Sequence, residues 1–231
     1  LKVCKNTEIL SQVLGLSTTD ALVARTAGLL HDMGRFRQYE TWNTFSDPIS
    51  ANHGILGVED IETHEVLENL SQAEKQSALT AIRYHNVYHP PEDLDSATMV
   101  LIKILRDADK IDIYRVVVEK YLEDRTGKRP GSQFITHSFE DDGTISEALA
   151  REIFKCRPLD SRKVRCLNDL KLLHISWLFD LSFEHSIRII HQKKYMDTIL
   201  KTLPALPIVR ELKGFIRQYM DNNLSKMSVN A

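Results

Sequence analysis

The segment Leu29-Leu30-His31-Asp32-Met33-Gly34 places an imidazole and a carboxylate side by side at the end of a predicted apolar helix. The residues Ser17 to Asp20 provide the cap that begins this helix, and apolar residues then follow at helical spacing. Gly34 is predicted to end it as a left-handed terminator. An adjacent His and Asp at a helix end can converge on one cation, or they can simply hydrogen-bond to each other. The choice depends on the downstream sequence.

Two histidines follow on separate predicted helices. A loop is predicted over residues 35–47, and Asp47-Pro48 is typical of a helix start, which would open the helix that carries His53. A capping box at Ser71–Glu74 precedes the next helix, which runs to His85. Taken alone, His85 is more simply explained as a core residue than as a ligand, and His53 equally well as a cap or a surface residue.

Asp109 lies on the longest periodic segment, which covers residues 96–123. It follows Leu105 by four residues and Ile102 by seven, so helical spacing places it on the apolar stripe. An unpaired carboxylate in a core is unfavourable by several kcal/mol, so such a group pairs with a cation or binds a metal ion.

The candidate metal ligands form a set of imidazole and carboxylate groups without thiolates: His31, Asp32, His53, His85 and Asp109. Donors of these two types suit Mn, Fe, Co, Ni or Zn in a catalytic site rather than in a structural zinc finger. We therefore expect one or two divalent transition metal ions as cofactors.

The sequence resembles the HD-domain superfamily of metal-dependent phosphohydrolases. Four stretches carry the resemblance: residues 29–36 around His31-Asp32, Asn52-His53-Gly54, Tyr84-His85-Asn86, and residues 105–112 around Asp109. It implies that His31, Asp32 and Asp109 hold a first ion and that His53 and His85 complete a second site. Asp32 is then the catalytic residue, either as a ligand that bridges both ions or, with one ion, as the group that takes a proton from water.

One position departs from the family pattern. The first His of the family normally lies on the opening helix, just before a stretch such as Leu1-Lys2-Val3, and this sequence has no His there. We expect the numbering to begin just past that residue. The alternative is an incomplete site without activity.

Two basic residues adjoin the motif. Arg35 directly follows it, and Lys110 is the neighbour of Asp109. We expect both to bind the phosphate of a substrate, although solvated surface charge explains them equally well.

Strand-like alternation is nearly absent, so the sequence predicts an all-α fold. Residues 1–125 are expected to form an HD-domain-like helical bundle, residues 126–143 an exposed loop, and residues 144–231 a helical extension. Helical patterns in the extension cover 144–155, 160–180, 183–202 and 207–222. These amphipathic helices would pack on the core, cover the site or form the interface of a homodimer.

Composition excludes several classes of function. The 231 residues carry a formal net charge of -2 without a basic run, which argues against an extended nucleic-acid partner. Neither GxGxxG nor GxxxxGK[ST] occurs. The three cysteines contain no CxxC pair and are odd in number, which favours a reducing, cytoplasmic setting. No apolar run reaches the roughly 20 residues of a membrane span.

We therefore expect a metal-dependent phosphohydrolase that cleaves a phosphoester, of a nucleotide or another small phosphorylated metabolite, through a metal-activated water. The alternatives are a catalytically decayed regulatory or nucleotide-binding module, a purely structural helical domain, and a di-iron oxygenase.

Overall fold

The computed structural model describes residues 1–125, 139 and 143–229. Within these ranges the regular elements are helices and no strand occurs, which confirms the predicted all-α class. The chain divides into two compact units, Leu1–Asp112 and Ile113–Ala231. The division after Asp112 and the predicted domain end at residue 125 both fall in one long helix, α6 (Ser96–Arg125). Apart from residues 139 and 143, the loop predicted over 126–143 lies outside the described residues.

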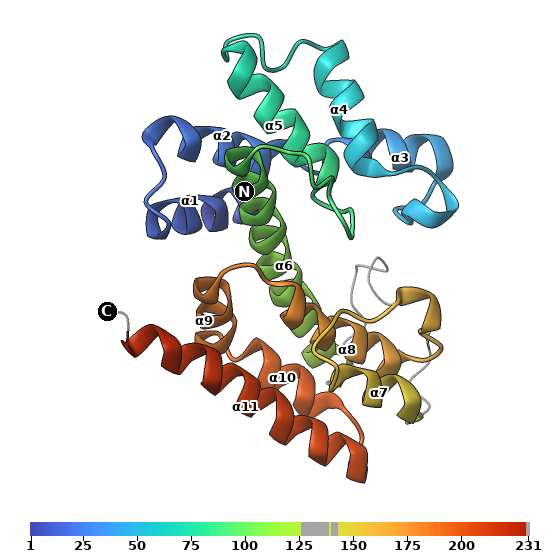
Figure 1. The fold of residues 1–231 in the computed structure, drawn as a ribbon. Helices are drawn as coiled ribbons and strands as arrows, with labels where there is room; N and C mark the ends of the chain where they lie inside the picture. Colours follow the sequence, from blue (N-terminus) through green and yellow to red (C-terminus); the bar gives the residue numbers. More distant parts are fainter. Residues whose placement is uncertain (126–138, 140–142, 230–231) are drawn as a thin grey trace. The chain divides into compact units, whose positions relative to one another are not determined.

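The helices of unit 1 pack in a series in which each helix contacts one or two others. Helix α1 packs on α2, α2 on α5, α5 on α4, and α4 on α3. Figure 1 shows these elements, whose bounds are α1 (Lys2–Val13), α2 (Thr18–Leu30), α3 (Gly34–Trp42), the 3-10 turn η1 (Asp47–Ile49), α4 (His53–Thr63), α5 (Gln72–Tyr84) and α6 (Ser96–Arg125).

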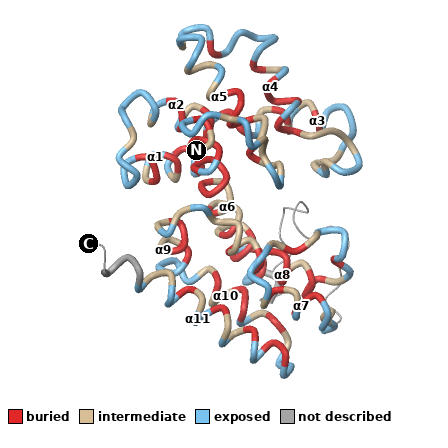
Figure 2. Tube along the Cα trace, in the orientation of Figure 1, coloured by how far each residue is buried: buried red, intermediate tan, exposed pale blue. Residues whose placement is uncertain are grey.

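The core of unit 1 fixes the end of α2, where the His-Asp pair lies. Val23, Ala27 and Leu30 are buried on one face of α2, whereas Leu22 and Leu29 on the other face are about half exposed, at 52% and 58%. Figure 2 shows the same alternation of buried and exposed positions along the helices. Because Leu30 is anchored in the core, the chain leaves α2 with His31 directed inward.

Local capping sets the starts of α2 and α5 as predicted. The Ser17 hydroxyl accepts a hydrogen bond from the Asp20 amide at 3.1 Å, which satisfies one of the free N–H groups at the start of α2. At α5, the Ser71 hydroxyl accepts from the Glu74 amide while the Glu74 carboxylate accepts from the Ser71 amide. The predicted capping box is therefore confirmed.

The loop predicted over residues 35–47 is wrong in its first part, because Gly34–Trp42 forms the helix α3. No Gly or Pro interrupts residues 35–47, and Arg35, Arg37, Gln38 and Glu40 are good helix formers. The helix ends where Asn43 adopts the left-handed conformation at φ 50°, which Asn tolerates better than most residues. The scattered aromatic residues obscured this pattern.

The roles predicted for Gly34 and Pro48 are also wrong. Gly34 begins α3 instead of terminating α2, and the described glycines with positive φ are Gly15 and Gly143. Pro48 lies in η1, which does not continue into the helix of His53. That helix, α4, has its own cap, because the Asn52 side chain accepts a hydrogen bond from the Ile55 amide at 3.1 Å.

Unit 2 is also helical. Its elements are α7 (Glu147–Ile153), η2 (Ser161–Lys163), α8 (Leu167–Ser176), η3 (Trp177–Asp180), α9 (Glu184–Gln192), α10 (Tyr195–Thr202) and α11 (Pro207–Val229). Helix α11 packs on α7 and α9, and α8 packs on α7 and α10. The helix predicted over 183–202 is interrupted, because Lys194 takes the left-handed conformation at φ 56° between α9 and α10. None of the described helices has both the length and the apolar character that a bilayer span requires.

A buried histidine joins two tyrosines in the core of unit 2. The Tyr121 hydroxyl lies 2.8 Å from His174 Nδ1, and the Tyr114 hydroxyl donates to the His174 carbonyl at 2.8 Å. The Trp177 ring packs edge-on against the imidazole. Burial lowers the pKa of His174 from 6.5 to about 3, because the charged ring would lose its hydration. The folded unit therefore holds His174 neutral.

The low pKa of His174 predicts a loss of stability in acid. Below pH 6.5 the unfolded chain gains a proton at this residue that the folded chain excludes, so stability falls by about 1.4 kcal/mol per pH unit until the folded pKa is reached. Between pH 7 and pH 5 this residue contributes a loss of about 2 kcal/mol. Urea unfolding at both pH values should show the loss in the wild type and a smaller one in His174→Gln. Equal losses in the two proteins would contradict the assignment.

Candidate metal centre

Five predicted ligands meet in unit 1 at the ends of helices and on α6. His31 and His85 directly follow α2 and α5, His53 is the first residue of α4, and Asp109 lies on α6. The three imidazoles are buried. By contrast, the Asp32 side chain is 54% exposed, so it is the group through which the centre reaches solvent.

Each imidazole is oriented through its Nδ1 atom. His31 Nδ1 lies 3.0 Å from the Gly28 carbonyl oxygen, and His85 Nδ1 lies 2.7 Å from the Ile82 carbonyl oxygen. A carbonyl can only accept, so both Nδ1 atoms donate and both Nε2 atoms keep a lone pair when the ring is neutral. His53 Nδ1 is held in the same way by the Asp47 carboxylate, at 2.8 and 2.9 Å. Metal-binding histidines are typically fixed like this.

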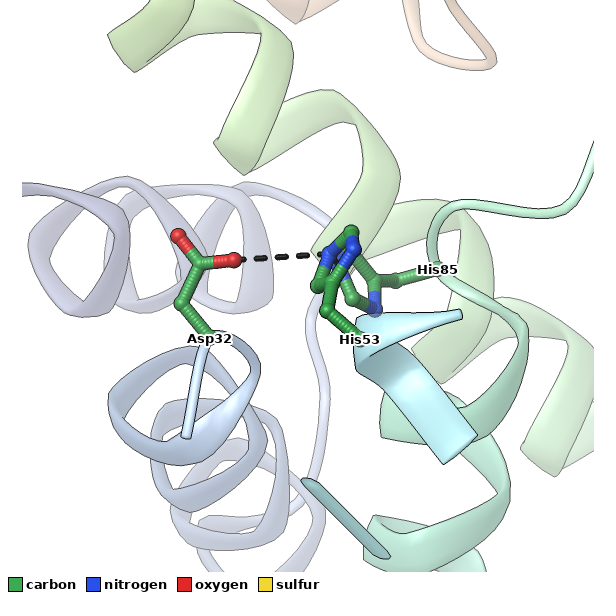
Figure 3. A group of neighbouring side chains, drawn as sticks. All are labelled: Asp32, His53 and His85. Carbon is green, nitrogen blue, oxygen red and sulfur yellow. Dashed lines mark hydrogen bonds and ion pairs between the residues drawn. The ribbon is translucent and has the colours of Figure 1, made fainter. Parts of the chain in front are cut away.

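The Nε2 atoms of His53 and His85 face each other at 3.0 Å. Since both Nδ1 atoms are already donors, two lone pairs point together, which is unfavourable unless a proton or a cation lies beside them. One oxygen of Asp32, Oδ1, lies 3.4 Å from His53 Nε2. Ligand atoms of Asp32, His53 and His85 all lie within 4.8 Å of one another, and Figure 3 shows the Asp32 carboxylate facing the two rings.

The other oxygen of Asp32 faces the remaining ligands. His31 Nε2 lies 3.4 Å from Asp32 Oδ2 and 3.5 Å from Asp109 Oδ1. The His31 Nε2 atom is buried and makes no hydrogen bond in the described structure. Asp32 therefore offers one oxygen to each of two ligand sets, His53 with His85 and His31 with Asp109.

The spacing of these atoms fits divalent ions. Two nitrogen or oxygen ligands at about 2.1 Å from one ion lie about 3.0 Å apart in octahedral geometry and about 3.4 Å apart in tetrahedral geometry. The observed separations of 3.0–3.5 Å match these values. The set of Asp32, His53 and His85 can therefore hold an ion with little rearrangement of the side chains.

Helix α6 is fixed against neighbouring segments by two residues just before Asp109, at positions 106 and 108. The Arg106 guanidinium donates to the carbonyl of His85 at 3.1 Å and also to that of Val87. The Asn6 amide of α1 donates to the Ala108 carbonyl at 2.9 Å. These contacts fix the position of Asp109 next to His31.

Burial and contacts within the centre set the protonation of its ligands. Burial lowers the pKa of His85 to about 4, so its ring is neutral near pH 7. Burial opposes ionisation of Asp32 and Asp109, but contact with His31 outweighs it and lowers the pKa of both carboxyls. Burial likewise opposes a charge on His31, yet Asp109 and Asp32 raise the pKa of His31 to about 10. A cation would take the place of this proton.

The two basic residues predicted to bind phosphate lie beside the ligands. Arg35 Nε is 3.4 Å from Asp32 Oδ1, and its Nη1 donates to Asp47 at 3.1 Å and to the Phe45 carbonyl at 2.6 Å. Lys110 is half-buried next to Asp109 on α6. The substrate contacts of Arg35 and Lys110 stay predictions.

Sequence reasoning missed three polar residues that support His53. The sequence indicates Asp47 only as a helix cap, and it predicts no role for Gln38 or Asn86. In the structure the amides of Gln38 and Asn86 donate to the Asp47 carboxylate at 2.8 and 2.9 Å. The one available signal was chemical: a metal-binding His needs an acceptor for its second ring nitrogen, and Asp47 lies six residues before His53.

Comparison with protein-family models matches residues 1–114 to the HD domain. These residues are an HD domain. The match contains all five predicted ligands and nearly coincides with unit 1. HD domains bind divalent metal ions, and the family consists in general of metal-dependent phosphohydrolases. Searches of curated proteins and of solved structures gave no significant match.

Proposed function

We propose that the HD domain is a phosphohydrolase that cleaves a phosphoester of a nucleotide or another small phosphorylated metabolite at a centre of two divalent cations. The observation that carries the proposal is the placement of Asp32, whose two oxygens face two separate histidine-containing ligand sets at 3.4 Å. A carboxylate so placed is suited to bridge a pair of ions. The donor types favour Mn, Fe, Co, Ni or Zn.

In this proposal the ligands divide into two groups that share Asp32. His53 and His85 would hold one ion with Asp32, and His31 and Asp109 would hold the other. Bound there, divalent ions lower the pKa of water toward neutrality and offset the charge on phosphoryl oxygens. The buried imidazoles keep water from the inner side of the centre, so substrate enters from the exposed side of Asp32.

Arg35 and Lys110 supply positive charge next to the ligands in the same proposal. Arg35 lies against the carboxylate oxygens of Asp32 and Asp47, which leaves its guanidinium at the rim of the centre. Lys110 follows Asp109 on α6. In this proposal both side chains bind phosphate oxygens next to the ions.

A catalytically decayed regulatory or nucleotide-binding module is the second candidate function. The observation in its favour is that, against the effect of burial, Asp109 and Asp32 raise the pKa of His31 to about 10, so without metal this ring holds a proton where a ligand needs a lone pair. Such a module would bind a phosphorylated ligand without turning it over.

The proposal is tested by stripping the protein with a chelator and reloading it separately with Mn²⁺, Fe²⁺, Co²⁺, Ni²⁺ and Zn²⁺. Bound metal is measured by elemental analysis, and hydrolysis is measured on nucleoside mono-, di- and triphosphates and on p-nitrophenyl phosphate. We expect about two ions per chain, as a bridged pair requires. We also expect phosphate release that the chelator abolishes and that at least one metal restores. Binding of the nucleotides without phosphate release would establish the regulatory module instead. A metal content near zero without phosphate release would exclude the phosphohydrolase and leave only the module.

A further inference from the structure

His53 differs from the other two histidines in how its ring can be held. His31 and His85 follow helices, so each reaches a carbonyl of the preceding turn, three residues back. His53 is the first residue of α4 and has no preceding helical turn. Its Nδ1 atom is held instead by a side chain from outside the helix, the Asp47 carboxylate of η1.

The Asp47 carboxylate is itself fixed by several donors. Besides His53, it accepts hydrogen bonds from Gln38 Nε2 at 2.8 Å, from Asn86 Nδ2 at 2.9 Å and from Arg35 Nη1 at 3.1 Å. Gln38 is fully buried, and its amide also donates to Ser50 and to the Ala51 carbonyl. The turn between α3 and α4 is therefore folded around this one carboxylate.

The same network sets the separation of His53 and His85. Asn86, which follows His85, donates from Nδ2 to Asp47 and also to Asn52 Oδ1 at 3.1 Å. Asn52 is the cap of α4 and precedes His53. Because Asp47 and Asn86 connect the start of α4 to the end of α5, they hold the two Nε2 atoms at 3.0 Å.

The described contacts support the other ligand set differently. His31 is oriented by the Gly28 carbonyl of its own helix, and Asp109 by the position of α6. The described contacts of Asp47 all lie on the His53 side of the centre. The two ligand sets thus depend on different parts of the fold.

We propose that Asp47 is a positioning residue that builds only one of the two cation sites, the one formed by His53, His85 and Asp32. It fixes the ring of His53 so that Nε2 meets His85, and as a carboxylate it makes that ring a more basic ligand. The site of His31 and Asp109 forms without it. This inference rests on the proposed centre of two cations.

The test is a titration of chelator-treated protein with Mn²⁺, followed by calorimetry and by electron paramagnetic resonance of the bound ions. We expect Asp47→Ala to weaken the affinity for one of two ions by about 10- to 100-fold and to leave the other unchanged. Asp47→Asn keeps an acceptor oxygen for His53 Nδ1 but removes the charge, so we expect an intermediate effect. The resonance should change from a coupled pair of ions toward a single ion.

Asp60→Asn is the matched control. Asp60 is also an aspartate near His53 in the fold, on α4, but its carboxylate pairs with Arg37 at 3.2 Å and not with a ligand. Both affinities should be unchanged in this variant. The ring tautomer gives a readout independent of metal: ¹⁵N resonances of His53 should report a proton fixed on Nδ1 in the wild type and a mixture of tautomers in Asp47→Ala. If Asp47→Ala does not fold, Asp47→Asn supplies the same two measurements.

The outcomes separate the inference from the proposed function. Two ions bound by the wild type and by both Asp47 variants with equal affinity would overturn the inference alone. Equal weakening of both ions would also overturn it, because the two sites would then share the support of Asp47. Absence of Mn²⁺ binding and of the other metals in the wild type would remove the proposed function, and the inference with it.

Discussion

Asp32→Ala is expected to lower phosphate release by more than about 100-fold, the upper end of the loss seen when only the supporting groups of a metal site are removed. Asp32 is the ligand that lies next to both sets, with Oδ2 3.4 Å from His31 and Oδ1 3.4 Å from His53. Its removal takes one ligand from each ion and leaves His31 with Asp109 alone. Bound metal should therefore fall from two ions per chain to one or fewer.

The control for this variant is Asp20→Ala, in the first turn of α2, the helix that precedes Asp32. Asp20 is exposed, and its side chain accepts a hydrogen bond from the Ser17 hydroxyl at 2.7 Å. This change should lower the free energy of unfolding by less than about 1 kcal/mol, through the start of α2, and should leave metal content and turnover as in the wild type. Turnover by Asp32→Ala within a few fold of the wild type would exclude the bridged centre.

Gly34→Ala is expected to destabilise unit 1 by about 3 kcal/mol or more, a large value for one methyl group. A Cβ at this position would lie 2.1 Å from the His53 carbonyl oxygen and 2.5 Å from the Gly57 amide nitrogen. Both are backbone atoms of α4, so the steric clash is relieved only if α3 and α4 move apart. Since that movement displaces His53, metal binding should be lost together with stability.

The comparison variant is Gly214→Ala in α11, where an added Cβ meets no atom within 4 Å. Replacing a helical Gly by Ala in open space should stabilise by about 0.5–1 kcal/mol. Urea unfolding followed by circular dichroism measures both variants. If the free energy of unfolding of Gly34→Ala lies within about 1 kcal/mol of the wild-type value, the close packing of α3 on α4 does not determine the stability of unit 1.

The parts of the fold that sequence alone predicted are those set by neighbouring residues. Ser17 and Ser71 cap helices through groups three residues away, and the apolar spacing of α6 repeats over many turns. The errors came where distant contacts decide. Gly34 is needed because α4 approaches α3, which the local sequence does not show, and a left-handed terminator was therefore the simpler interpretation.

The candidate site divides in the same way. The five ligand residues could be selected from the sequence because imidazole and carboxylate groups recur near helix ends and on an apolar face, and because the pattern resembles a known family. The structure places His31, Asp32, His53, His85 and Asp109 together, while their roles as ligands stay predictions. Asp47 could not be found by periodicity, because its contacts with Gln38 and Asn86 join three segments through side chains alone.

The helix ends at the centre also influence which charged species binds there first. Helices α2 and α5 both terminate at a histidine of the centre, and the carboxyl end of a helix carries a partial negative charge of about half an electron. The carboxylates of Asp32, Asp47 and Asp109 add to this negative potential, whereas Arg35, Lys110 and the proton that the raised pKa keeps on His31 offset it. Under the proposed function, metal ions that take the place of the His31 proton would add positive charge to the centre. The added charge would favour association of a phosphorylated substrate after the ions have bound.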